Sequence, residues 1–404
     1  MHATIGTQLS SAFKRLAWSN LAAQSAEQIA LAATPILAVI AFGADAGETG
    51  VLQTAQTLPF VLFAIPAGVL ADRLSRRTVM ACAEALRALS LAAVLALAAL
   101  GGLSWPMLAA LGFLGACGTV AFSATAPSLV PSLVPSDALA AANTRIELAR
   151  TVAFAAGPAL GGALVGWVGG ASAFGVAAAL SACAVMLLSG VREPPRPARH
   201  PLDDVREGAR FMFGHPLLRP IFVTQFVFNT AFFVMQAVFV PYAVRRLGLS
   251  ASGVGLTLAT YGVGMVAGAL IASRVMRLLP IGVVIAIGPV AGLVAALVMV
   301  LTIWAPAAPL AAASFFLMGA GPIIWVISTT TLRQTVTPSE LLGRVSALNI
   351  VAYGARPIGA AIGAALGGLY GAEACLVVAA FGFLIQAATI LVSPVVRLAR
   401  QPGI

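Results

Sequence analysis

The chain is 404 residues long, 60% of its residues are hydrophobic and 9% are charged, and its mean hydropathy is +1.00. Soluble globular domains carry about 25% charged residues, so this composition excludes an ordinary soluble domain and indicates a polytopic membrane protein. Because backbone polar groups inside a bilayer must be hydrogen-bonded within helices, the expected fold class is all-α.

A helix that crosses a bilayer needs about 20 apolar residues. Twelve segments of the chain meet this length and are joined mostly by short loops. They lie near residues 16–42, 49–71, 78–101, 105–130, 147–167, 171–191, 219–243, 252–273, 280–303, 308–332, 345–370 and 372–396. This spacing leaves no room for a soluble catalytic domain.

The net charge of +10 could suggest nucleic-acid binding, so the placement of the basic residues decides its meaning. When both termini are assigned to the cytoplasm, 19 of the 23 Lys and Arg fall on the cytoplasmic side, including Arg150 near the start of the fifth segment. Only Arg245 and Arg246 fall outside, and Arg87 and Arg356 lie within segments. This asymmetry is the positive-inside pattern of membrane proteins. We therefore expect a bacterial inner membrane protein whose basic residues contact anionic lipid and not nucleic acid.

The first segment contains "SNLAAQSAEQ", in which Asn20, Gln24, Glu27 and Gln28 stand at i, i+4, i+7 and i+8. On a helix these side chains form one polar stripe along an apolar rod, which predicts a face turned toward a cavity. Glu27 has no ionisable partner at helical spacing. A carboxyl group can take up and release a proton, so Glu27 is the candidate for proton coupling, and the alternative is that it neutralises a buried arginine.

The loop after the second segment reads "GVLADRLSRR" and places Gly68, Asp72, Arg73, Arg76 and Arg77 in a pattern that resembles the signature loop of the major facilitator superfamily. The resemblance implies twelve transmembrane helices in two pseudo-symmetric six-helix bundles that alternate between two access states. It also implies that Gly68 permits close helix approach and that the charged residues form a cytoplasmic gate between the halves. The alternative is that these basic residues only anchor the topology.

The third segment carries Glu84 and Arg87 at i and i+3, which predicts a structural ion pair.

The fifth segment contains "AGPALGG", and its Gly157, Pro158, Gly161 and Gly162 resemble the Gly-Pro motif of export members of the superfamily. Glycines allow close packing, and the proline removes one backbone hydrogen bond, so a bendable helix at a sliding surface is expected.

The longest polar stretch, residues 192–218, divides the chain into an N-terminal six-helix bundle, residues 1–191, and a C-terminal six-helix bundle, residues 219–404. Its second part has helical spacing of apolar residues and predicts a short amphipathic helix on the cytoplasmic surface, with a plain linker as the alternative. The segments "HPLDDVREGARFMFGHPLL" and "LRQTVTPSELLGRVSALN" resemble the branch that contains the enterobactin exporter and bacterial drug and macrolide effluxers.

Polar residues also share helix faces in the second half. Asn349, Tyr353 and Arg356 stand at i, i+4 and i+7, and Asn229 and Gln236 lie on one face of the seventh segment. These stripes predict a central substrate cavity with an aromatic wall. The predicted cavity residues are Asn20, Gln24, Gln28, Asn229, Gln236, Trp325, Asn349, Tyr353 and Arg356. Arg356 is expected either to bind an anionic group of the substrate or to pair with Glu27.

The sequence thus favours a proton-driven exporter of a small, partly apolar molecule, siderophore-like or drug-like, that acts as a monomer. Two alternatives remain: a proton-coupled metabolite importer, and a transporter-like sensor or scaffold that binds without transport. An enzyme is disfavoured because His2, His200 and His215 all lie outside the segments and no nucleophile constellation is present. No cofactor and no metal are expected.

Overall fold

The structure is a computed structural model, and it describes residues 10–135, 138–191, 202–338, 341, 345 and 352–400. The apolar segments of the first half form helices that begin and end near their expected limits. These elements are α1 (Ser11–Phe42), α2 (Ala46–Thr57), α3 (Pro59–Arg73), α4 (Arg76–Ala99), α5 (Trp105–Leu133), α6 (Leu139–Ala163), the π-helix η2 (Leu164–Val168) and α7 (Ser172–Ser189).

A shorter helix, α8 (Leu202–Gly214), stands between the two halves of the chain. The second half contains α9 (Leu218–Arg245), α10 (Ala251–Leu278), α11 (Ile281–Leu301), α12 (Ala308–Val336), α14 (Ala355–Leu391) and the 3₁₀-helix η3 (Pro394–Arg397).

Ten of the described helices are long and apolar enough to cross a membrane, and the difference from the twelve predicted segments has two local causes. The second predicted crossing is divided into α2 and α3 at Leu58, directly before Pro59. The last two predicted crossings are joined in α14 by a kink at Gly371, whose φ of 83° suits glycine. Together these elements give the twelve crossings of an all-α polytopic membrane protein.

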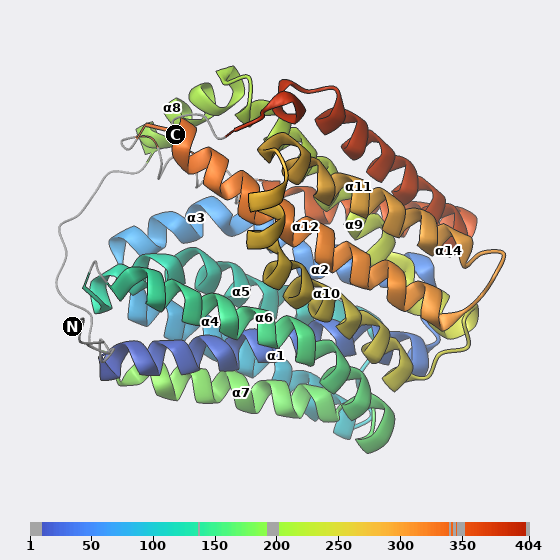
Figure 1. Ribbon diagram of the computed structural model, residues 1–404. Coiled ribbons are helices and arrows are strands. Elements are labelled where there is room, and N and C mark those ends of the chain that lie inside the picture. Colours follow the sequence, from blue (N-terminus) through green and yellow to red (C-terminus); the bar gives the residue numbers. More distant parts are fainter. Residues whose placement is uncertain are drawn as a thin grey trace, which may run out of the picture.

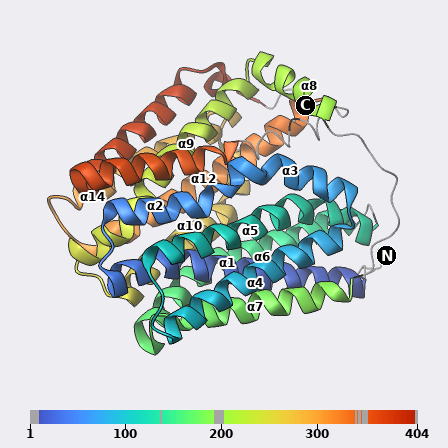
Figure 2. The same ribbon diagram turned by 180° about the vertical axis from the view of Figure 1, so that it is seen from behind.

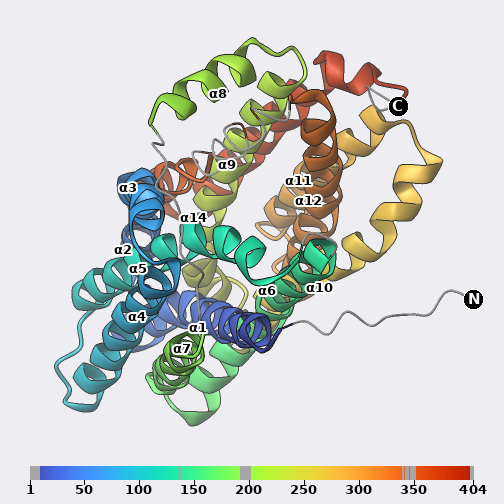
Figure 3. The ribbon, with the colours of Figure 1, turned by 90° about the vertical axis from the view of Figure 1, so that its left-hand side faces the viewer.

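The helices form two groups. Helix α1 packs against α6 and α7, and α4 packs against α5 and α7, whereas α9 packs against α14 and α12 packs against α10 and α11. Figure 1 shows the two groups one above the other, and the view from the left-hand end in Figure 3 shows α10 beside α6 where the groups meet. The start of α1, the end of α12 and α8 all lie toward that left-hand end.

Two helix pairs make the main contacts between the groups: α2 with α14, which Figure 2 shows side by side, and α6 with α10. Both interfaces depend on small residues. A Cβ on Gly50 of α2 would lie 2.4 Å from the Cα of Ala364, and a Cβ on Gly162 of α6 would lie 2.7 Å from the Cα of Gly255. Backbones can approach this closely only where side chains are absent. These contacts lie at the end of the molecule opposite the start of α1, and we call this end the far end.

Candidate functional site

A cavity of about 340 Å³ lies between the two groups of helices. Residues of α1 to α7 form one side of its wall, and residues of α9 to α12, Tyr353 and α14 form the other side. A volume of this size suits a small organic molecule.

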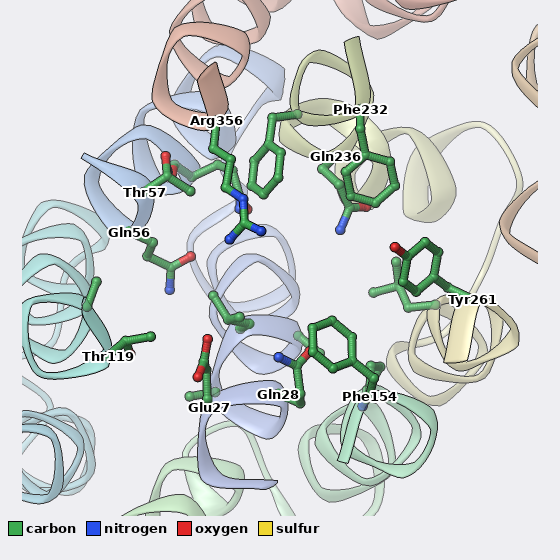
Figure 4. A pocket seen from close by; sticks show the side chains of 18 of the residues that line it. Glu27, Gln28, Gln56, Thr57, Thr119, Phe154, Phe232, Gln236, Tyr261 and Arg356 are labelled. Carbon is green, nitrogen blue, oxygen red and sulfur yellow. The ribbon is translucent and has the colours of Figure 1, made fainter. Parts of the chain in front are cut away.

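One side of the cavity wall is polar, and the other combines aromatic rings with the amides of Gln28 and Gln236, as Figure 4 shows. Glu27 of α1 and Arg356 of α14 enter the cavity from opposite directions. The polar side carries Gln56, Thr57 and Thr119, and the aromatic side carries Phe154, Phe232 and Tyr261. Such a wall suits an amphiphilic molecule, with an apolar body against the rings and a polar group toward the amides and charges.

Glu27 shares one guanidinium with a second carboxylate. A nitrogen of Arg87 lies 3.9 Å from Oε2 of Glu27, and another lies 3.0 Å from Oε1 of Glu84. Arg87 is held in place because it also donates to the carbonyl oxygen of Ala23 at 2.9 Å and to the hydroxyl of Thr119 at 2.8 Å. Glu84 is fully buried, whereas the Glu27 side chain is 18% exposed and lines the cavity.

The charges of this cluster do not balance when both acids are ionised. Two carboxylates then face one guanidinium, and a single proton shared between Glu27 and Glu84 makes the group neutral. Glu27 is the member in contact with the cavity, so it is the one that can exchange a proton with water there. The sequence offered Arg356 as an ion-pair partner of Glu27. In the structure the arginine within ion-pair distance of Glu27 is Arg87 of α4. Sequence spacing missed this pair because α1 and α4 meet only through tertiary packing.

Arg356 is held by aromatic rings and an amide. Its Nε donates to Oδ1 of Asn229 at 3.3 Å, and its guanidinium carbon lies 4.1 Å from the ring centre of Tyr353. The rings of Phe60 and Phe233 lie 5.2 and 5.4 Å away. Among the described residues, no carboxylate lies within 4.0 Å of Arg356. Cation–π contacts compensate a buried charge only in part, so this cation can accept an anionic group.

A third arginine, Arg150, also lines the cavity, although the sequence assigns it to the cytoplasmic side. It pairs with Glu147 and lies over the ring of Phe154 at 5.5 Å. The helix α6 begins at Leu139, earlier than the predicted segment 147–167, so Arg150 lies about three turns into the helix and not at its cytoplasmic end.

The other predicted cavity residues differ in position. Gln28, Asn229, Gln236, Trp325, Tyr353 and Arg356 line the cavity together with Glu27. Asn20 and Gln24 are not part of the wall; Asn20 is buried and donates to the carbonyl oxygen of Ile146 on α6 at 3.4 Å. The polar stripe of α1 therefore turns from the helix interface to the cavity along its length. Asn349 lies outside the described residues.

Several wall residues were not predicted, among them Gln56, Phe60, Phe154 and Tyr261. A usable signal was present in the second segment, where Gln53, Gln56 and Thr57 stand at i, i+3 and i+4. The aromatic residues gave no such signal, because a phenylalanine in a membrane helix serves equally well against lipid or core.

Among the described residues, four buried polar atoms on the cavity wall lack a hydrogen-bond partner: Oε1 of Gln56, Nε of Arg87, Nε1 of Trp325 and Oε1 of Gln386. Buried polar groups are normally hydrogen-bonded, so these atoms are available to a bound molecule or to water.

The glycines of the fifth predicted segment lie where α6 meets two other helices. A Cβ on Gly157 would lie 2.4 Å from the Cβ of Gln28, and one on Gly161 would lie 2.8 Å from the carbonyl oxygen of Ile29. The other face of the same motif approaches α10. There the carbonyl oxygen of Pro158 would lie 2.5 Å from a Cβ on Gly255, opposite Gly162.

The predicted cytoplasmic gate occupies the end of α3 and the start of α4. Gly68 and Asp72 lie within α3, and the side chain of Asp72 is outside the described part of the structure. Arg73 is exposed, Arg76 is buried and Arg77 is half-buried.

Two helical bundles around a polar cavity form the architecture of a secondary transporter. Residues 16–360 match the Major Facilitator Superfamily, and the chain belongs to this family of transporters.

Two relatives show what this chain resembles. It is 28% identical to the multidrug efflux pump Tap of Mycolicibacterium fortuitum over 85% of this chain and 86% of the relative. It is 30% identical to the enterobactin exporter EntS of Citrobacter koseri over 76% of this chain and 72% of the relative.

Solved structures share the fold at low sequence identity. A bacterial homologue of the iron transporter ferroportin, in an inward-facing state, superposes with a TM-score of 0.71 at 16% identity, over 93% of this chain and 98% of that one. A bacterial homologue of the lysosomal transporter Spinster, inward-facing and occupied, gives 0.70 at 18% identity over 96% of both chains.

Proposed function

We propose that this protein is a bacterial inner membrane exporter that moves a small amphiphilic molecule out of the cell in exchange for protons. The observation that carries the proposal is the position of Glu27, on the cavity wall and beside an arginine that a second carboxylate already shares. The names of the relatives support export, and the positive-inside pattern supports cytoplasmic termini.

In this orientation the far-end contacts between α2 and α14 and between α6 and α10 close the periplasmic side. The cargo enters from the cytoplasm, its apolar part against the aromatic side of the cavity and its polar group toward Arg356. Rocking of the two bundles then opens the periplasmic side. The residues Gly68, Asp72, Arg73, Arg76 and Arg77 close the cytoplasmic side in that second state.

Glu27 supplies the coupling. Facing the periplasm, it takes up a proton as cargo leaves, and the cluster with Glu84 and Arg87 becomes neutral. Facing the cytoplasm, it releases the proton and returns to its ion pair with Arg87. An amide or hydroxyl side chain cannot perform this exchange.

The test is transport by the purified protein in vesicles of known orientation, with enterobactin and the aromatic cation ethidium as probes. In inside-out vesicles with an acidic interior, we expect accumulation of a probe that stops when a protonophore collapses the gradient. Accumulation only in right-side-out vesicles would favour the importer. Saturable binding of a probe without flux under either gradient would favour the sensor.

A further inference from the structure

A directional polar contact joins the two bundles at the far end. Arg245, in the last turn of α9, donates from Nη2 to the carbonyl oxygen of Gly43 at 2.7 Å and to that of Ala44 at 2.9 Å. Gly43 and Ala44 belong to the turn after α1, so the contact joins the C-terminal bundle to the N-terminal bundle.

The acceptors are well placed for a cation. The chain leaves α1 through Gly43, whose φ of 68° lies in the left-handed region, and the amides of Gly43 and Ala44 point back to the carbonyls of Val39 and Ala38. The carbonyl oxygens of Gly43 and Ala44 therefore lie just beyond the last turn of a long helix, at its C-terminal end, where Arg245 reaches them. That end of a helix carries partial negative charge and binds cations.

The neighbouring arginine has different partners. Arg246 donates to the carbonyl oxygen of Ile303 at 3.0 Å, and its Nε lies 3.6 Å from Glu373. Both partners belong to the C-terminal bundle. Two adjacent arginines at one helix end thus have different partners: Arg245 crosses between the bundles to two carbonyl oxygens, and Arg246 stays within one bundle, where it also pairs with Glu373.

Small residues make the closest approaches in the remaining contacts between α2 and α14 and between α6 and α10, and the rings of Phe154 and Tyr261 add an apolar contact at the cavity. At Gly47, for example, a Cβ would lie 3.0 Å from the Cα of Gly368. Such surfaces slide and separate without breaking a directional bond. Hydrogen bonds from a charged donor, in contrast, have a defined geometry and are stronger than neutral ones.

We infer that Arg245 is a gate residue that holds the far end of the transporter closed and must release Gly43 and Ala44 each time that end opens. The inference requires only the alternating-access cycle of the family. It does not depend on the direction of transport, on the cargo or on proton coupling.

The test measures opening at the far end directly. Spin labels on Leu100→Cys and Trp304→Cys report the distance between the bundles, because both residues are exposed and stand on far-end turns of different bundles. The background lacks Cys82, Cys117, Cys183 and Cys375. In this background we compare Arg245→Gln, Arg245→Lys and the matched control Arg246→Gln by pulsed electron resonance in lipid.

Arg245→Gln should increase the ratio of the far-end-open population to the closed one by about tenfold, as expected for lost charge-assisted hydrogen bonds. Arg245→Lys should give a smaller increase, since one ammonium keeps the charge but not the planar geometry. Arg246→Gln should leave the distribution unchanged. The inference is overturned if Arg245→Gln leaves the distribution unchanged, or if both Gln variants shift it equally. Size-exclusion profiles and melting temperatures identify any variant that has lost its fold.

Discussion

Arg356 shows how a single residue can be located from sequence while its surroundings cannot. The sequence shows a permanent cation deep in a crossing, and insertion of such a charge costs about 2.5–3.5 kcal/mol, which indicates a function. Its contact with Phe60 could not be foreseen, because that ring comes from the other bundle. The same limit applies to Glu27, whose partner Arg87 is set by helix packing.

Replacement of Arg356 by lysine tests its role in binding. We expect Arg356→Lys to raise the apparent Km for an anionic substrate by roughly tenfold, because an ammonium cannot form two parallel hydrogen bonds to a carboxylate or a similar group. The Km for an uncharged or cationic substrate should change little. Equal changes for all substrates would indicate that Arg356 acts through the structure of the cavity and not through its charge.

Trp325 offers a second test at the scale of one atom. Trp325→Phe keeps an aromatic ring and removes the indole N–H, which has no hydrogen-bond partner among the described residues. We expect weaker substrate binding by about 0.5–1.5 kcal/mol and an unchanged melting temperature without substrate. Titration calorimetry and thermal denaturation measure the two quantities. A lower melting temperature with unchanged affinity would assign the N–H to the fold.

Among the elements, the limits of most helices follow from apolar length, caps and proline. The predicted boundary between residues 370 and 372 coincides with the kink at Gly371 in α14, where a chain reversal needs a positive φ. The division of the second crossing at Leu58 was not predicted, although Pro59 was visible, because proline is also tolerated inside membrane helices. Which helices face each other across the two bundles could not be read from apolar length alone.

The contact between α2 and α14 yields a prediction for Gly50. A Cβ at this position would lie 2.4 Å from a backbone atom of Ala364, so Gly50→Ala should hinder closure of the far end. Closure can be followed by disulfide formation between Ala46→Cys and Gly367→Cys, since a Cβ on Gly367 would lie 3.0 Å from that of Ala46.

We expect Gly50→Ala to slow this cross-link at least several-fold. The control is Gly102→Ala, where a Cβ meets nothing closer than 3.9 Å, and it should cross-link at the parental rate. Equal rates in the two variants would show that α2 and α14 can close without the glycine.

For the whole molecule, the composition and the placement of charged residues were sufficient to predict a polytopic membrane protein. Apolar length gave the crossings, and the loop around Asp72 gave the family, which the match over residues 16–360 confirms. The cavity required the structure, because its wall combines residues from twelve of the described helices, many of them distant in the chain. Asn20 and Glu27 have the same polar character in the sequence, and only packing decides that one faces α6 and the other faces the cavity.

The cluster of Glu27, Arg87 and Glu84 predicts how the cycle depends on protons. Glu27→Gln keeps the size and hydrogen bonding of the side chain but can no longer exchange a proton. Gradient-driven export should therefore be lost, while exchange of substrate across the membrane without a gradient continues. Glu373→Gln removes a half-exposed carboxylate far from the cavity and serves as the control, with export expected at the parental level.

The most direct measurement uses inside-out vesicles that contain the parent protein, Glu27→Gln or Glu373→Gln. It follows the accumulation of substrate against its concentration gradient over a range of lumenal pH. If Glu27 couples export to protons, Glu27→Gln accumulates no substrate at any pH and still exchanges labelled for unlabelled substrate at equilibrium. Accumulation by Glu27→Gln with the pH dependence of the parent would show that Glu27 does not couple export to protons.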